Sequence, residues 1–207
     1  YGRELKARVV AEQVRRLAGI DVDVPVDPVP GDVDGLRWRT RMQFARTPDG
    51  RRGLRLHRSH DVIPIDDCLI ARADIVDRRV DPTATVTERL TWAGGSADFA
   101  MTADGFWQVH PGAPRVFVDH VLAALAPQPG ERVIDLYAGV GLFTVPLAHA
   151  VGARGRVVAA EGAARAVAFG RRNTAGLPQV SWLRGDVAQL LRFHRSAQGR
   201  ADLVVLD

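Results

Sequence analysis

The second half of the chain alternates short apolar runs with stretches whose apolar residues recur at helical spacing. We predict strands and helices there in the order strand 133–137, helix 143–150, strand 157–161, helix 163–174, strand 180–184, helix 187–193 and strand 203–207. Strands and helices that alternate in this way form a right-handed, mostly parallel sheet. The predicted fold class is therefore α/β, with a Rossmann-like sheet over 127–207.

In the usual order of such a sheet, the fourth strand lies beside the first and leaves its other side unpaired. We therefore expect the sheet to be incomplete after its fourth strand and to continue beyond Asp207. The chain also begins abruptly within a helical pattern, with no methionine and no capping residue. We expect it to start inside a longer protein.

The first half of the chain has the patterns of a smaller, β-rich α+β region. Residues 1–18 have apolar side chains at helical spacing, and 36–45 alternate as a half-buried strand does. The Pro-Asp-Gly turn at 48–50 predicts a hairpin. Further elements are expected as strands at 53–58, 60–65 and 99–102, a short helix at about 67–76, and a helix at 115–125. We divide the chain into an N-terminal region at 1–98, a connecting strand and helix at 99–126, and the sheet domain at 127–207.

A glycine-containing turn joins the first strand of the predicted sheet to its helix. Gly139 and Gly141 allow the backbone to curl tightly and approach a ligand, and the following helix offers its unpaired N–H groups. Glu161 ends the next strand, where such sheets place the acid that binds a ribose diol. Thr144 stands where a dinucleotide fingerprint has its third glycine, which favours a nucleoside without a pyrophosphate, such as S-adenosylmethionine. A tight turn without a ligand is the alternative.

Acidic residues end several strands of this predicted sheet. Ligands of doubly wound sheets bind at the carboxyl ends of the strands. A single acid at such a place is more often a turn or cap residue, but several at one edge favour a binding site. The acids at this edge are Asp135, Glu161, Asp186 and Asp207.

Three arginines alternate along the strand predicted at 36–45. Arg37, Arg39 and Arg41 would share one face, and like charges in register repel one another, so an anionic partner such as RNA is favoured. A solvated sheet face is the alternative. The 28 basic residues exceed the 24 acidic ones and are almost all arginine, which suits nucleic acid but also follows from high-GC coding.

Composition excludes several other classes of protein. No apolar run approaches the roughly twenty residues of a membrane span, and no signal peptide opens the chain. We therefore expect a cytoplasmic protein without membrane partners, acting as a monomer. Cys68 is the single cysteine, which excludes an internal disulfide and a complete cysteine-ligated metal site within the chain.

Three motifs together resemble one enzyme family. Asp135-Leu-Tyr-Ala-Gly-Val-Gly-Leu-Phe-Thr144, preceded by Phe106-Trp-Gln-Val-His110 and Trp38-Arg-Thr-Arg41, is similar to the S-adenosylmethionine-dependent RNA uracil-5 methyltransferases, which make 5-methyluridine in transfer and ribosomal RNA. The resemblance covers roughly the whole chain. It implies that Gln108 contacts the methionine end of the cofactor, that Tyr137, Gly139 and Gly141 line its pocket, and that Glu161 holds the ribose. It further implies that Asp186 faces the adenine of the cofactor and that Asp207 lies beside the substrate base. Arg39 and Arg41 would lie toward the RNA.

The chain departs from the family pattern at several places. Leu142 stands where relatives often have a polar asparagine, and the segment between Cys68 and Phe106 is several tens of residues shorter. Cys68 resembles the last of four cysteines that hold a 4Fe-4S cluster in many members, and the other three would precede the chain. The family's nucleophilic cysteine and general base lie beyond Asp207. We therefore assign no catalytic residue here and expect the 207-residue chain to bind cofactor weakly and transfer no methyl group.

The resemblance also implies a reaction and a substrate. In the family, a thiolate adds to C6 of uracil, which activates C5 to accept the methyl group, and a base then removes the C5 proton. The target base must be unstacked, so the expected substrate is a flipped uridine in structured RNA. The alternatives are a methyltransferase for another acceptor, a non-catalytic RNA-binding protein that keeps the fold, and an NAD-dependent enzyme.

Overall fold

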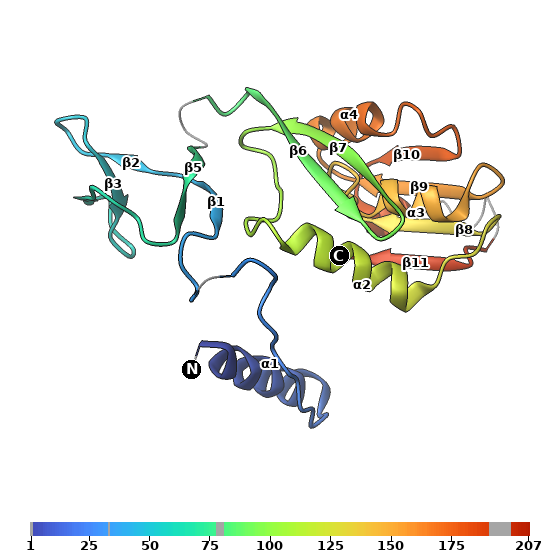
Figure 1. Ribbon diagram of the computed structural model, residues 1–207, viewed down its shortest axis with the longest axis horizontal. Helices are drawn as coiled ribbons and strands as arrows, with labels where there is room; N and C mark the ends of the chain where they lie inside the picture. Colours follow the sequence, from blue (N-terminus) through green and yellow to red (C-terminus); the bar gives the residue numbers. More distant parts are fainter. Residues whose placement is uncertain (1, 33, 78–80, 191–199) are drawn as a thin grey trace.

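The chain folds around a four-stranded parallel sheet (Figure 1). The structure is a computed structural model, and it describes residues 2–32, 34–77, 81–190 and 200–207. The sheet has the order β10-β9-β8-β11, so the fourth strand pairs with the first, as predicted. Its strands are β8 (Arg132–Leu136), β9 (Arg156–Glu161), β10 (Val180–Arg184) and β11 (Leu203–Leu206).

The helices of this sheet also follow the predicted order. They are α3 (Thr144–Val151) and α4 (Ala164–Asn173), whose ends lie within one residue of the predicted ones. Residues 187–190 are helical, and the remainder of the helix predicted at 187–193 lies outside the described residues. The short apolar runs and the 3.6-residue apolar period were sufficient to locate these elements, because the strands are buried within the sheet and each helix buries one face against it.

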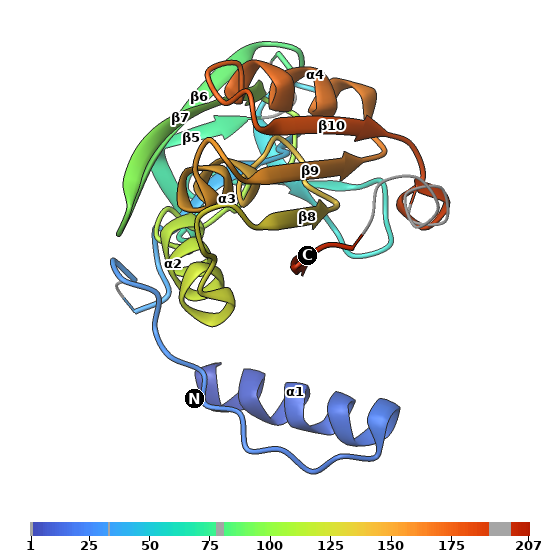
Figure 2. The ribbon, with the colours of Figure 1, turned by 90° about the vertical axis from the view of Figure 1, so that its right-hand side faces the viewer.

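A hairpin and a helix complete the core of the sheet domain. The hairpin consists of β6 (Thr85–Trp92) and β7 (Gly95–Thr102), and α2 (Ala113–Leu125) follows it. Figures 1 and 2 both show this hairpin lying along one side of the parallel sheet. Six of the most deeply buried side chains come from these elements, from the sheet and from α3: Phe99, Met101, Val118, Val133, Leu147 and Val157. The predicted domain boundary after residue 98 falls inside β7, so it divides a hairpin that belongs to this core.

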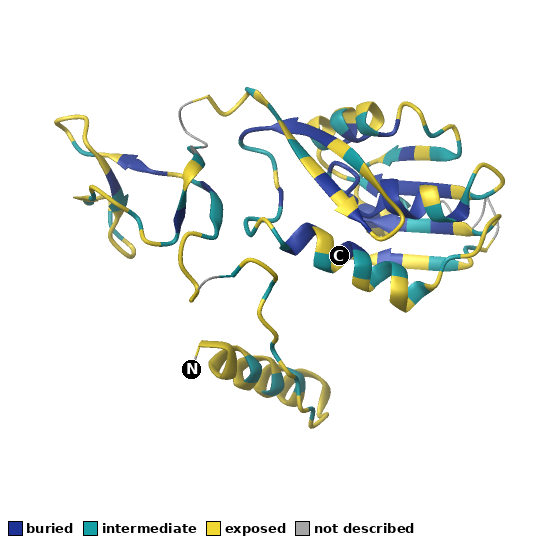
Figure 3. Cartoon of the chain, viewed as in Figure 1, coloured by how far each residue is buried: buried dark blue, intermediate teal, exposed yellow. Residues whose placement is uncertain are grey.

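The N-terminal part is smaller and more open. The helix α1 (Gly2–Ala18) has the predicted extent but no buried residue, and Figure 3 shows it exposed along its length. A small antiparallel sheet contains β2 (Ala45–Arg46), β3 (Arg52–Arg55) and β4 (Val62–Pro64). The predicted Pro-Asp-Gly turn joins β2 to β3. The strand β1 (Arg39–Met42) precedes it.

Two predictions in this part are wrong. The segment expected as a helix at 67–76 contains instead the strand β5 (Ala71–Asp77), which pairs with β1 in parallel. Pairing gives β1 a hydrogen-bonding partner, and this long-range gain outweighs the local helix propensity of the segment. The strand predicted without interruption at 36–45 is divided into β1 and β2, with Gln43 and Phe44 outside both.

None of the helices in the described part of the chain combines the length and the apolar character that crossing a membrane requires.

Candidate functional site

The loop after β8 has the tight backbone that its glycines predicted. Gly139 and Gly141 have φ values of +56° and +99°, and Tyr137 has +60° although it is not a glycine. The Gly141 N–H donates to the Ala138 carbonyl at 2.8 Å, which closes the turn before α3. A Cβ on Gly139 would meet no atom within 4 Å, so this face of the loop is open to a ligand.

Glu161 connects the ends of two neighbouring strands. Its Oε2 accepts a hydrogen bond from the Gly139 N–H at 3.0 Å, and its Oε1 accepts one from the Ala163 N–H at 2.7 Å. Each carboxylate oxygen has a further lone pair available for a donor. The side chain is therefore held by backbone and can still accept hydrogen bonds from a ligand's hydroxyl groups.

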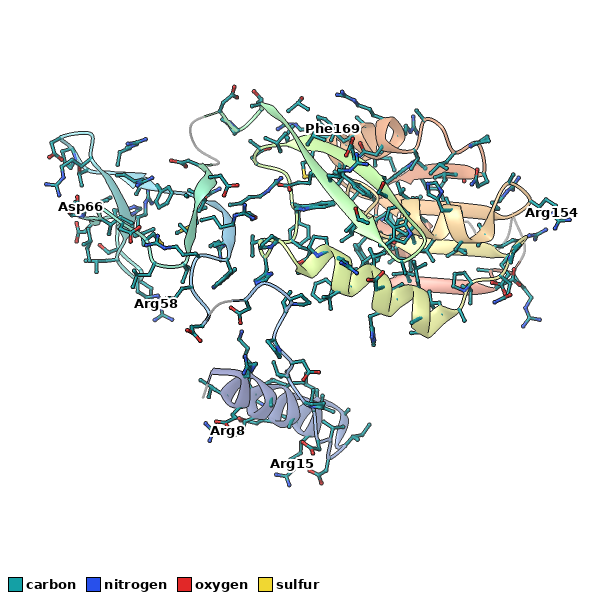
Figure 4. The ribbon with its side chains drawn as sticks, in the orientation of Figure 1. Arg8, Arg15, Arg58, Asp66, Arg154 and Phe169 are labelled. Atoms are coloured by element: carbon teal, nitrogen blue, oxygen red, sulfur yellow. The ribbon has the colours of Figure 1, made fainter. Side chains whose placement is uncertain are left out.

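A cavity of about 410 Å³ opens beside Glu161, between the loop after β8, the face of α4 and the end of β7. Tyr137, Gly139 and Glu161 line it, so the structure brings together three residues that the sequence had placed in one site. Ala163, Ala166 and Phe169 form an apolar wall, and Figure 4 labels Phe169 on α4. The cavity thus offers a carboxylate and an apolar surface side by side.

A smaller cavity of about 50 Å³ continues around the same loop. Gln108 and Asp207 line it together with Tyr137 and Gly139, which also line the larger cavity. Leu142 is part of this lining and is buried. The aromatic segment at 106–110 and the end of β11 therefore meet the glycine loop, although they lie about thirty and about seventy residues from it in the sequence.

Two predicted cofactor residues lie outside both linings. Gly141 is turned toward the protein interior, where an added Cβ would stand 3.5 Å from the Trp182 ring and 3.6 Å from Thr144. Asp186 accepts a hydrogen bond from the Gln189 N–H at 2.9 Å, so it caps the helix that begins at residue 187. Gly141 thus shapes the loop, and a contact of Asp186 with adenine stays a prediction.

Asp135 is fully buried beneath the loop. Its Oδ2 accepts a hydrogen bond from the Thr144 hydroxyl at 2.5 Å, and its Oδ1 has no hydrogen-bond partner among the described residues. The pKa of this carboxyl is raised to about 7, mainly because burial disfavours its charged form. The hydrogen bond from Thr144 opposes the change, and the nearby charges of Asp207 and Glu161 add to it. Thr144 stands where a dinucleotide fingerprint has its third glycine, and its hydrogen bond to Asp135 connects the start of α3 to β8.

Three residues that the sequence did not single out also shape the site. Asn173, at the end of α4, donates to the carbonyls of Val140 and Ala100 at 3.0 Å each, and thereby connects the glycine loop to β7. Arg165 and Asp104, which both line the larger cavity, form an ion pair at 3.3 Å. A polar residue at a helix end gives no sequence signal for such bridging, because helix ends are commonly polar.

The three arginines predicted to face RNA do not share a face. Arg37 precedes β1 with φ +53° and forms an exposed ion pair with Asp67, whose pKa it lowers. Arg39 is half-buried, and its guanidinium lies 5.7 Å from the Trp38 ring. Arg41 is only 2% exposed and reaches Glu88 at 3.4 Å and the Gly105 carbonyl at 3.2 Å.

The predicted common face is therefore wrong. The pairing of β1 with β5 shifts its register between Arg39 and Arg41, which breaks the simple alternation of side chains. Arg41 joins β1 to the β6–β7 hairpin and is not available at the surface. RNA contacts of Arg37 and Arg39 stay predictions.

Cys68 is half-buried, with its Sγ 3.8 Å from the Met42 Sδ. Across residues 2–32, 34–77, 81–190 and 200–207, no three His, Cys, Asp or Glu side chains converge as metal ligands would. A cluster held by four thiolates does not fit the residues of this chain alone, because the chain supplies one. The role of Cys68 as a cluster ligand stays a prediction.

Known proteins resemble this chain in sequence. No protein-family model matches it. An uncharacterized RNA methyltransferase of Streptomyces coelicolor is 34% identical over 269 residues, which cover 99% of this chain and 58% of the relative. The 23S rRNA (uracil(1939)-C(5))-methyltransferase RlmD of Pseudomonas fluorescens is 26% identical over 275 residues, 98% of this chain and 60% of that protein. The chain thus spans about 60% of the length of these relatives.

A solved structure shows the same fold. The crystal structure of the Pyrococcus abyssi tRNA (uracil-54, C5)-methyltransferase, in complex with S-adenosyl-L-homocysteine, matches 99% of this chain and 67% of that one, with a TM-score of 0.66 and 15% identity. The match confirms an α/β fold of the S-adenosylmethionine-dependent methyltransferases. In sequence the chain is thus similar to RNA methyltransferases, one of them a uracil-C5 methyltransferase, and in fold it is similar to a solved tRNA uracil-C5 methyltransferase.

Proposed function

We propose that the whole protein transfers a methyl group from S-adenosylmethionine to C5 of a uridine in structured RNA, either transfer or ribosomal. The observation that carries this proposal is the pair of adjoining cavities around the glycine loop, which gather Gln108, Tyr137, Gly139 and Glu161. The similarity of the chain to RNA methyltransferases and the RNA substrates named for two of these proteins support the same interpretation.

The residues of the two cavities fit the parts of S-adenosylmethionine. Glu161 would accept hydrogen bonds from the ribose hydroxyls, and the apolar wall of Ala163, Ala166 and Phe169 would take the purine ring. Tyr137 and Gln108 would hold the methionine end near the smaller cavity. When bound, the cofactor supplies an electron-deficient methyl group.

The uridine would approach from the side of the smaller cavity. Asp207 lies there, at the end of β11, beside Gln108 and the exposed Tyr137. These residues would orient the base.

Methyl transfer by the whole protein is tested with unmodified bacterial ribosomal and transfer RNA and isotopically labelled S-adenosylmethionine. Digestion to nucleosides and mass spectrometry should find the label in 5-methyluridine. Label in another nucleoside would support a methyltransferase for a different acceptor. RNA binding without any transfer would support the non-catalytic alternative.

Glu161→Ala is expected to weaken the binding of S-adenosylhomocysteine by roughly 1–3 kcal/mol, because charge-assisted hydrogen bonds to the ribose are lost. Isothermal titration of the whole protein measures this change. Glu131→Ala is the matched control, since Glu131 also accepts a backbone hydrogen bond, from the Gln128 N–H at 2.6 Å, but lines neither cavity. Equal affinity of the Glu161 variant and the wild type would remove the ribose assignment.

A further inference from the structure

A third cavity, of about 380 Å³, lies between α1, the loop that follows it and the start of α2. Arg3, Lys6, Asp27, Trp38, His110 and Phe117 are among the residues that line it. None of its lining residues also lines the two cavities at the glycine loop. It is therefore a separate site, which neither the cofactor nor the uridine being methylated accounts for.

Flat side chains gather at the wall of this cavity. The Trp38 ring is stacked on the His110 ring with their centroids 6.1 Å apart and their planes 20° from parallel. The Arg39 guanidinium lies 5.7 Å from the centre of the Trp38 ring. Trp38 is only half-buried, whereas the other three tryptophans, Trp92, Trp107 and Trp182, are 4%, 6% and 9% exposed. A partly open indole backed by other planar groups is the arrangement on which proteins stack single nucleobases.

His110 adds a polar group that its surroundings leave unsatisfied. Its Nδ1 accepts a hydrogen bond from the Gly112 N–H at 3.1 Å, so in the neutral ring the proton is on Nε2. This Nε2 is buried and has no hydrogen-bond partner among the described residues. A buried donor without an acceptor is unfavourable, so a water molecule or a ligand atom that accepted from Nε2 would stabilise this ring.

Side chains of both charges line the cavity. Arg3 and Lys6 lie on the same face of α1, three residues apart, and both reach the lining. Asp27 supplies a carboxylate, while Val29 and Phe117 make apolar walls. Cations suit a phosphate, a carboxylate accepts hydrogen bonds from an exocyclic amino group, and apolar walls with an indole suit the flat base between them.

We propose that this cavity binds one unstacked nucleotide of the RNA, away from the uridine that is methylated. The base stacks on Trp38, its amino group faces Asp27, and its phosphate is held by Arg3 and Lys6. Adenine, guanine and cytosine have an exocyclic amino group and uracil does not, so the site disfavours uridine. That the nucleotide belongs to RNA rests on the proposed function.

Tryptophan fluorescence tests the proposal, because Trp38 lines this cavity and is half-buried. Trp107 lines the smaller cavity at the glycine loop, so the Trp38→Phe variant is titrated in parallel and only the signal that it loses is assigned to Trp38. Five-nucleotide oligoadenylate is titrated into the whole protein, and oligouridylate, AMP and UMP are titrated in parallel. We expect oligoadenylate to quench the fluorescence and to bind more tightly than oligouridylate, with AMP binding weakly. AMP binding as tightly as oligoadenylate would assign the cavity to a free nucleotide and overturn the RNA proposal.

Variants separate stacking from charge. By fluorescence anisotropy of labelled oligoadenylate, Trp38→Leu is expected to weaken binding about 5- to 150-fold, the usual effect of losing one stacked base, and Trp38→Phe is expected to weaken it less. Lys6→Ala should weaken binding and lower its salt dependence. Arg8→Ala is the matched control, since Arg8 is exposed on the same helix, is labelled in Figure 4, and does not line the cavity. Unchanged affinity in both Trp38→Phe and Lys6→Ala would overturn the proposal, even where Trp38→Leu failed to fold.

The outcome can be separated from that of the proposed function. S-adenosylhomocysteine binding is measured on the same variants, and Trp38→Leu is expected to leave it unchanged. Cofactor binding with no oligoadenylate binding would remove the nucleotide site and leave the proposed function standing. Oligoadenylate binding through Trp38 with no cofactor binding would support the nucleotide site and contradict the proposed function.

Discussion

Replacing Arg41 by alanine is expected to lower the free energy of unfolding by about 3 kcal/mol. The Arg41 side chain is 1% exposed, and it joins β1 to the β6–β7 hairpin through Glu88, the Gly105 carbonyl and the Met101 sulfur. Its removal leaves a cavity and takes a partner from each of these groups. The expected loss lies at the lower end for buried ion pairs, because Glu88 is 35% exposed and water can solvate it in the variant.

Chemical denaturation of the chain measures this change. Arg39→Ala is the comparison, since Arg39 lies two residues away in the same strand and is less buried. We expect it to cost about 1 kcal/mol, because it loses one hydrogen bond, from its Nε to the Arg41 carbonyl at 3.0 Å. The two variants also distinguish folding from RNA binding. A stable Arg41→Ala protein that has lost only RNA affinity would show that this arginine faces the RNA after all.

The Asp135→Asn variant is expected to remove a pH dependence of stability. The pKa of Asp135 is raised to about 7 in the folded chain, against about 4 when it is unfolded. The unfolded chain therefore releases this proton first as the pH rises, so the stability present below pH 4 is lost progressively up to about pH 7. Between about pH 5 and pH 8 the loss amounts to about 2–3 kcal/mol, because each tenfold difference between the two acid dissociation constants corresponds to about 1.4 kcal/mol.

Asparagine keeps an oxygen that can accept from Thr144 but carries no charge. Denaturation curves at about pH 5 and pH 8 should therefore lie closer together for the variant than for the wild type, with the variant more stable at the higher pH. Asp202→Asn serves as a control, because Asp202 accepts a backbone hydrogen bond from the Arg132 N–H, at the opposite end of β8 from Asp135. The same pH dependence in Asp135→Asn and wild type would show that this carboxyl is ionised in the folded state throughout the range.

The sheet domain could be predicted from the sequence because the patterns that mark its strands, helices and turns are local. Each strand is a short apolar run, each helix has one apolar face, and Gly139 and Gly141 mark the turn between them. The position of Glu161 follows from the order of the elements, since the carboxyl ends of parallel strands share an edge. Its hydrogen bond to Gly139 confirms that the two lie together.

The N-terminal part resisted prediction because long-range pairing decides its structure. Residues 71–77 form a strand because they pair with β1, which lies about 30 residues earlier in the chain. No local sequence pattern predicts this pairing. The same pairing shifts the register beside Arg41 and buries a charge that the alternating pattern had indicated as exposed. Asn173 likewise forms hydrogen bonds with Val140 and with β7, and no spacing in the sequence predicts these contacts.

The central claim is that S-adenosylmethionine binds over the glycine loop with its ribose on Glu161. A crystal structure of the whole protein with S-adenosylhomocysteine tests this most directly. We predict the ribose hydroxyls within hydrogen-bonding distance of the Glu161 carboxylate, and the homocysteine end between Tyr137 and Gln108. Density for the ligand elsewhere, with this cavity filled by the protein's own side chains and Glu161 turned away, would contradict the account.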